Sequence, residues 1–218
     1  MTELLRFGLL GGLLGLDGTA VGQFMVSRPL VAGWLSGWAA GAPELGITIG
    51  AILELFLLVS FPTGGARFPE GSTAAVVAVG VAVPFEGSGA VAAAVAMGLL
   101  WGQVGGWSVT VQRRVNGRLV PPEVGPGTGR LGRAHLLAIV TDFLRGAAVT
   151  AAGVVLGRTA LDVVDARWPV DPGASIGVLY VGAAVSLGIL LHDLGGFRRR
   201  RVLFALGLAF GIVGARFL

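Results

Sequence analysis

The 218-residue sequence is 54% hydrophobic and 13% charged, with a mean hydropathy of +0.83. A soluble domain has roughly 25% charged residues, so this composition excludes an ordinary soluble domain and predicts a polytopic protein of the lipid bilayer. The formal net charge is +4 and every basic residue is arginine. In a soluble protein, such an excess of basic residues would suggest nucleic-acid binding. Arginines between apolar segments instead indicate the orientation of a membrane protein, so we expect no nucleic-acid partner.

The first apolar segment covers residues 4–22. It imitates a signal peptide, but Asp17 lies within it and no convincing small-x-small cleavage site follows. We therefore interpret it as a retained helix. Its glycines at 8, 11, 12 and 15 have the four-residue spacing that lets helices pack closely in lipid.

Residues 23–72 are apolar but are interrupted by Arg28, Glu44, Glu54 and four prolines. A carboxylate in a bilayer is costly, so Glu54 is expected to face a cavity or a partner. Residues 30–41 are too few to cross a hydrocarbon core that needs about 20 helical residues. We therefore predict a re-entrant hairpin broken at residues 42–44, with its glycines at 33, 37 and 41 on one packing face, followed by a nearly complete span over 45–61. Broken helices of this kind build polar sites in transporters.

The next segments are a short apolar piece at 73–84, broken after Pro84, and a full span at 90–111 that contains Gln103. Residues 112–133 form the predicted main hydrophilic loop, with five arginines against one acid. A span over 134–156 follows, in which Asp142 and Arg145 are three residues apart and can pair on one helical face.

The chain continues with a predicted loop at 158–171, a span at 176–191, an arginine cluster at 198–201 and a last apolar segment at 202–212. Two spans separate the 112–133 loop from the 198–201 cluster, so both are predicted on the same, cytoplasmic side. The sequence does not assign the N-terminal part of the chain to either side of the membrane. The predicted fold is therefore all-α, a single integral membrane domain over residues 1–218 with about six to eight membrane segments, including broken or re-entrant helices.

Several motifs resemble one family, the membrane IIC subunit of the mannose/fructose/sorbose-type sugar phosphotransferase system, as a shortened and divergent member. The motifs are QF at 23–24, RPLVAG at 28–33, PELG at 43–46, IGAILEL at 49–55, Pro62 and PE at 69–70, with weaker matches at Gln103, Arg113-Arg114, Asn116 and His135.

The resemblance implies a multi-pass permease of the bacterial inner (cytoplasmic) membrane that translocates a hexose-type sugar. It implies a IID membrane subunit, soluble IIA and IIB phosphocarriers and a trimeric assembly. In that system the IIB histidine phosphate phosphorylates the sugar, so this chain is expected to be a transport subunit and not an enzyme.

A sugar site needs side chains that accept from and donate to hydroxyls. Glu54 is the first candidate for sugar binding, followed by Gln23 and Gln103, although Gln103 can equally bond a neighbouring helix. Arg28 and Glu44 are possible site residues with a structural alternative, in which Arg28 caps helix-end carbonyls or pairs with Glu44 or Glu54.

No catalytic residue, metal or cofactor is predicted. His135 and His192 lack metal-ligand spacing, Ser88 is not in a Gly-x-Ser-x-Gly elbow, and the glycine-rich run at 125–130 lacks the ending of a phosphate loop. The alternative function is a non-transporting membrane scaffold or assembly subunit of the same fold, because family members usually continue with a further hydrophobic stretch.

Overall fold

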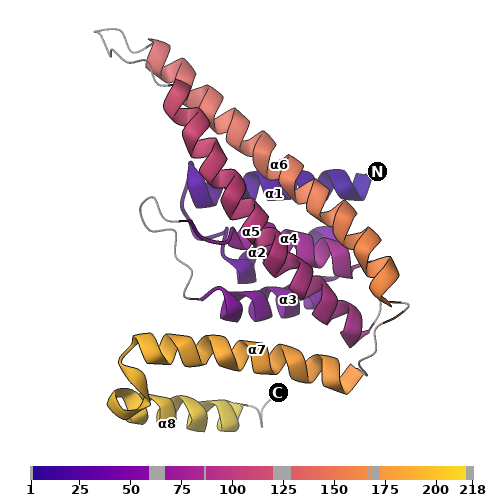
Figure 1. Cartoon of the computed structure of the whole chain (residues 1–218), viewed down its shortest axis with the longest axis vertical. Coiled ribbons are helices and arrows are strands. Elements are labelled where there is room, and N and C mark those ends of the chain that lie inside the picture. Colours follow the sequence, from indigo (N-terminus) through magenta and orange to yellow (C-terminus); the bar gives the residue numbers. More distant parts are fainter. Residues whose placement is uncertain are drawn as a thin grey trace.

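The computed structural model describes residues 2–58, 67–85, 87–119, 129–165, 167 and 172–214. This part of the chain is all-α and has no strands (Figure 1). Its helices are α1 (Thr2–Thr19), α2 (Pro29–Ala40), α3 (Pro43–Phe56), α4 (Gly71–Ala82), α5 (Ser88–Leu119), α6 (Gly129–Asp165), α7 (Pro172–Asp193) and α8 (Gly196–Gly214). The helical content and the short α2, α3 and α4 confirm the predicted all-α membrane fold with broken helices.

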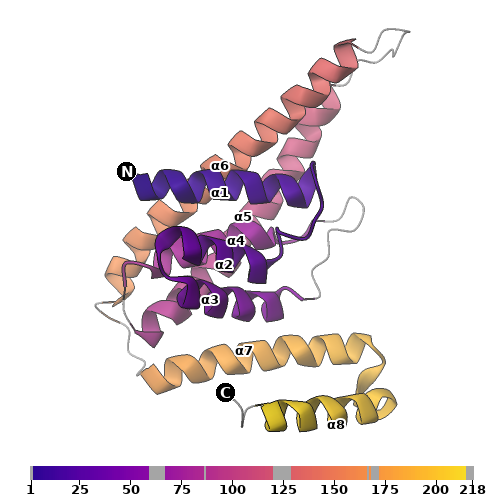
Figure 2. The same cartoon turned by 180° about the vertical axis from the view of Figure 1, so that it is seen from behind.

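Among the described residues, three helices are long and apolar enough to cross a membrane, namely Gly89–Leu119 in α5, Leu131–Val163 in α6 and Gly173–Asp193 in α7. Helices α5 and α6 form an antiparallel pair that extends beyond the rest of the molecule, as both views show (Figures 1 and 2). The shorter helices α1 to α4 pack against the lower part of this pair. Helix α7 lies below α3, and α8 folds back along it.

Two predicted loops are partly helical in the structure. Residues 112–119 belong to α5, and residues 129–133 and 158–165 belong to α6. The loop predictions were wrong over these stretches because hydropathy marks where polar residues begin, whereas arginine and glutamine are themselves good helix formers. The rest of the 112–133 loop, residues 120–128, lies outside the described part of the chain.

Helices α2 and α3 form a hairpin broken at the predicted residues 42–44. Helix α3 has 14 residues and ends at Phe56, so the nearly complete span predicted over 45–61 was wrong. Each of the two helices begins with proline at its first position, Pro29 and Pro43, where the missing N–H costs nothing. The turn between them depends on Gly41, which caps α2 in the left-handed conformation (φ 78°) and donates its N–H to the carbonyl of Trp38 at 3.1 Å. Gly41 therefore forms the turn and does not belong to the packing face predicted for it.

The other glycines of the hairpin let its two helices touch along their backbones. A Cβ at Gly33 would lie 2.6 Å from the carbonyl oxygen of Gly46 and 2.7 Å from the Cα of Gly50. A Cβ at Gly37 would lie 2.7 Å from the Cα of Gly46. The flat glycine face predicted from the four-residue spacing is confirmed for Gly33 and Gly37, and it closes within this chain.

Helix α4 is the centre of the core, because every residue from Ser72 to Ala82 is buried. It is small and apolar on all sides, as expected of an internal helix, and it packs against α1, α2, α5 and α6. The glycines of α5 face it: a Cβ at Gly98 would lie 2.8 Å from the Cβ of Ala78. At 12 residues, α4 is about 18 Å long, well short of a bilayer core of about 30 Å.

Candidate functional site

A cavity of about 70 Å³ lies where the end of α1, the segment before α2 and the start of α4 meet. The polar residues in its lining are Thr19, Ser27, Arg28, Glu70 and Ser72. Pockets for small molecules usually measure about 300–1,000 Å³. At 10–15 Å³ for each water, this cavity has room for roughly five waters, so it is smaller than an ordinary small-molecule site.

Glu70, at the start of α4, is the centre of a buried ionic cluster. Its carboxylate accepts from Arg145 Nη2 at 2.8 Å and from Nη1 at 3.1 Å, and Thr73 Oγ1 donates to it at 2.6 Å. The backbone N–H of Glu70 donates to the carbonyl of Gly102 at 2.8 Å. The two-bond contact with a guanidinium is the strongest geometry available to a carboxylate.

Arg145 extends the cluster to further helices. Its Nε donates to Asp142 Oδ1 at 2.7 Å, and its Nη1 donates to Ser108 Oγ at 2.8 Å. The other oxygen of Asp142 accepts from the hydroxyl of Thr19 at the end of α1. The pairing of Asp142 with Arg145, predicted from their spacing on one helical face, is confirmed. Side chains of α1, α4, α5 and α6 thus meet around one guanidinium.

The fit of Glu70 requires glycine on the facing helix. A Cβ at Gly105 would lie 2.7 Å from Glu70 Oε2 and 3.2 Å from the Cβ of Thr73. On the α1 side, a Cβ at Gly15 would come no nearer than 3.5 Å to Arg145 Nη2. The room for the charged cluster is therefore made chiefly by the missing side chain at Gly105.

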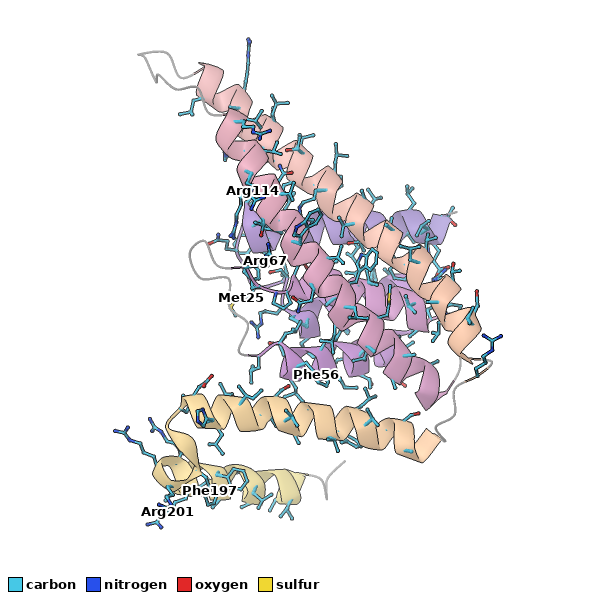
Figure 3. The ribbon with its side chains drawn as sticks, viewed as in Figure 1. Met25, Phe56, Arg67, Arg114, Phe197 and Arg201 are labelled. Carbon is cyan, nitrogen blue, oxygen red and sulfur yellow. The ribbon has the colours of Figure 1, made fainter. Side chains whose placement is uncertain are left out.

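Asp17 holds the segment between α1 and α2 in place. Its buried carboxylate accepts the backbone N–H groups of Phe24 at 2.7 Å and Ser27 at 2.9 Å. The segment held in this way contains two residues in the left-handed region, Gln23 (φ 55°) and Met25 (φ 64°), which non-glycine residues seldom adopt. Figure 3 shows Met25 at the outer edge of the body.

Arg28 and Glu54 form a second ion pair beside the cavity. Arg28 Nε donates to Glu54 Oε1 at 2.8 Å, and its Nη2 contacts the same oxygen. The other oxygen, Glu54 Oε2, accepts the N–H of Leu30 at 3.2 Å, so the carboxylate also caps the N-terminal end of α2. Of the two predicted partners of Arg28, Glu54 is the one it contacts, and Glu44 is exposed on the first turn of α3.

The three predicted sugar ligands are not brought together. Glu54 adjoins the cavity through Arg28, whereas the side chain of Gln23 is exposed and Gln103 is exposed on the outer face of α5. Sequence reasoning missed Glu70 as a site residue, although it belongs to the PE motif at 69–70. It also used Asp17 solely as a sign against a signal peptide, when an acid within an apolar helix was itself a signal.

Within the described ranges, no group of three or more His, Cys, Asp or Glu side chains could hold a metal ion. The arrangement is instead one of carboxylates, guanidinium groups and hydroxyls, which can exchange hydrogen bonds with a polar, uncharged molecule.

Comparison with known proteins agrees with this architecture. A solved structure described as a membrane protein superposes with a TM-score of 0.76 at 16% identity, covering 97% of this chain and 87% of the other, and so shows a shared fold. No curated protein matches the chain. The model of one family, the sorbose-specific IIC component of the phosphotransferase system, matches residues 1–192. The chain thus belongs to the sorbose-specific IIC family of membrane components, whose members are sugar permeases.

Proposed function

We propose that this chain is the sugar-translocating subunit of a mannose/sorbose-type phosphotransferase system in the bacterial inner membrane, and that it passes a hexose-type sugar to a cytoplasmic IIB phosphocarrier. The observation that carries the proposal is a cavity lined by Arg28 and Glu70. Each of these residues is held in an ion pair, Arg28 with Glu54 and Glu70 with Arg145. Carboxylates accept and guanidinium groups donate hydrogen bonds, so together they suit the hydroxyls of a sugar.

The sugar requires a wider site than this cavity. Arg28 and Glu54 belong to the α2–α3 hairpin, whereas Glu70 and Arg145 belong to α4 and α6. Because the hairpin helices are locked to each other by glycine packing, the hairpin moves as one body. In the proposed mechanism, its separation from α4 opens the cavity and exposes both charged pairs to the sugar, and Glu54 is the first sugar ligand.

Gln103 supports a second membrane subunit of the IID kind. It lies within the Gly89–Leu119 span, on an exposed face with Leu100, Val104 and Trp107. Lipid tails offer an amide no hydrogen bond, so a protein partner is the suitable neighbour for this face. In this proposal Gln103 either bonds that partner or reaches the sugar from the interface, and Gln23 becomes a ligand if the partner covers the exposed 20–25 segment.

The proposed assembly leaves phosphoryl transfer to IIA and IIB, with no phosphorylated residue in this chain. Trimerisation with IID is the proposed oligomeric state. The glycine faces of α2, α3 and α5 close within the chain, so support for a partner now comes from the exposed amide and not from unused glycine faces.

The test is uptake of labelled hexoses by cells that express this chain with its IIA, IIB and IID partners. Glu54→Gln is expected to lower uptake by about tenfold, equivalent to the loss of roughly 1.4 kcal/mol of binding, with the same amount of protein in the membrane. Asp162→Asn, an exposed carboxylate near the end of α6, serves as the control and should transport normally. Unchanged uptake by Glu54→Gln would remove the residue from the site. Absence of uptake by the unaltered chain would favour the alternative function, a non-transporting membrane scaffold or assembly subunit.

A further inference from the structure

The turn between α7 and α8 concentrates positive charge. Arg198, Arg199, Arg200 and Arg201 follow one another and are all exposed. Within the described ranges none of the four forms an ion pair with a carboxylate, and the neighbouring acid, Asp193, instead faces His192 Nδ1 at 3.6 Å. Figure 3 shows Arg201 pointing away from the helices at this turn. Helix α8 is kinked at Arg200 (φ −122°, ψ 17°), shortly before its apolar run begins.

An apolar groove of about 420 Å³ lies between α7 and α8 and ends at this cluster. Its lining includes Leu187, Gly188, Leu191, Leu194 and Phe204. Two of these residues connect it to the charged turn. The carbonyl of Leu194 accepts from Arg200 Nε at 3.4 Å, and the ring of Phe204 packs edge-on against Phe197, with centroids 5.2 Å apart.

We propose that this end of the α7–α8 hairpin is a binding site for an anionic phospholipid, with the phosphate on the arginines and an acyl chain in the groove. Helix α7 is long enough to span the bilayer and α8 turns apolar at Val202, so the arginines lie at the membrane surface. Arginine clusters beside a membrane helix attract anionic headgroups, and guanidinium groups bind phosphate through paired hydrogen bonds. A soluble phosphate would leave the groove without a function.

Native mass spectrometry of the full-length protein in mild detergent tests the site. Phosphatidylglycerol and phosphatidylcholine are added separately, and the lipids retained per chain are counted. The unaltered chain is expected to retain phosphatidylglycerol preferentially. The Arg198→Gln, Arg199→Gln, Arg201→Gln triple variant should bind it more weakly by about fivefold for each arginine. Arg200 is kept because it bonds the Leu194 carbonyl.

Two further variants separate the groove from simple charge attraction. Gly188→Leu places a side chain in the groove, where a Cβ meets nothing within 4 Å, and should weaken retention at least about fivefold with all arginines present. A triple Arg114→Gln, Arg118→Gln, Arg133→Gln variant removes equal charge from the α5–α6 pair and should retain lipid normally.

Four results would overturn the proposal. The first is equal retention of the two lipids. The second is an equal loss of retained lipid in both triple variants, which would indicate general charge attraction and no defined binding site. The third is binding of glycerol phosphate or inorganic phosphate as tight as that of the lipid, which would leave the acyl groove without a role. Capture of an acidic protein through the 198–201 cluster, with no lipid preference, would likewise replace the lipid by a protein partner.

Discussion

Arg145 connects four helices through its own hydrogen bonds and those of Asp142 and Glu70. Its side chain is 8% exposed and that of Glu70 is 6% exposed. Removing one member of such a pair leaves a buried charge without its partner, which costs more than the intact pair contributes. The cluster therefore has a structural role besides its position beside the cavity.

We expect Glu70→Gln to lower the free energy of unfolding by about 3 kcal/mol, the lower end for breaking a buried ion pair, because Asp142 still faces Arg145. Thermal unfolding in detergent measures the loss. Glu44→Gln, which changes an exposed carboxylate, should stay within about 0.5 kcal/mol of the unaltered chain. A Glu70→Gln variant as stable as the Glu44→Gln control would show that the pair contributes nothing to folding.

Gly105→Ala offers a test that leaves every charge in place. Its Cβ would lie 2.7 Å from Glu70 Oε2, so the carboxylate must shift, and overpacking of this kind costs about 1–3 kcal/mol. Gly117→Ala on the same helix meets nothing within 4 Å, and there alanine should be neutral or stabilising by up to about 1 kcal/mol. The same unfolding measurement compares the two, and equal behaviour would contradict the close packing of α5 on Glu70.

At the residue scale, the sequence predicted the pairs that hydropathy or helical spacing makes visible. Arg28 and Glu54 stand out in apolar surroundings, and Asp142 and Arg145 share a helical face. Glu70 did not stand out, because it follows a stretch of sequence rich in proline and glycine, where an acid is ordinary. Its burial arises from α5 and α6, which lie far away in sequence and have no local signal for this contact.

At the element scale, Arg158 shows why helix ends were harder to predict than helix centres. The sequence predicts a loop at this position, but Arg158 lies within α6. Its Nε donates to the carbonyl of Gly80 at 2.7 Å, and its Nη2 contacts Glu3 at 2.8 Å. It thereby satisfies a carbonyl in the last turn of α4, where intrahelical donors run out. Such a contact depends on the position of another helix, which no window of sequence contains.

The orientation of the elements gives a prediction about sidedness. The end of α5 and the α7–α8 turn lie at the same side of the molecule, on the left in Figure 1, and the start of α7 lies at the other. The chain has no cysteine, so single cysteines can be labelled cleanly. We expect Gly117→Cys and His192→Cys to be protected in intact cells from an impermeant thiol reagent, because arginine-rich ends face the cytoplasm.

Gly173→Cys, at the start of α7, is the matched position on the opposite side and should be labelled from outside. Labelling of Gly117→Cys or His192→Cys in intact cells would reverse the proposed topology. Protection of all three until the cells are opened would show that α7 does not cross the membrane.

At the scale of the whole molecule, the exposed face of α5 with Gln103 leads to a prediction about assembly. Purified in mild detergent from cells that also make a IID subunit, the chain is expected in a complex whose mass corresponds to more than one subunit. Gln103→Cys should crosslink to that partner, whereas Gly117→Cys, near the arginine-rich end of α5, should not. A monodisperse monomer that transports sugar in liposomes would refute the assembly.

The short helices have a consequence for how the protein enters the membrane. A helix of 12 residues such as α2 leaves the end of its backbone within the hydrocarbon layer, where unpaired groups cost several kcal/mol each. We therefore expect α2 to leave the insertion machinery together with α3, after α3 has packed against Gly33 and Gly37. Bulky side chains at these two glycines should reduce the amount of protein that matures, as measured by pulse-chase labelling. The molecules that mature should also transport more slowly, because packing at the same two glycines makes the hairpin move as one body.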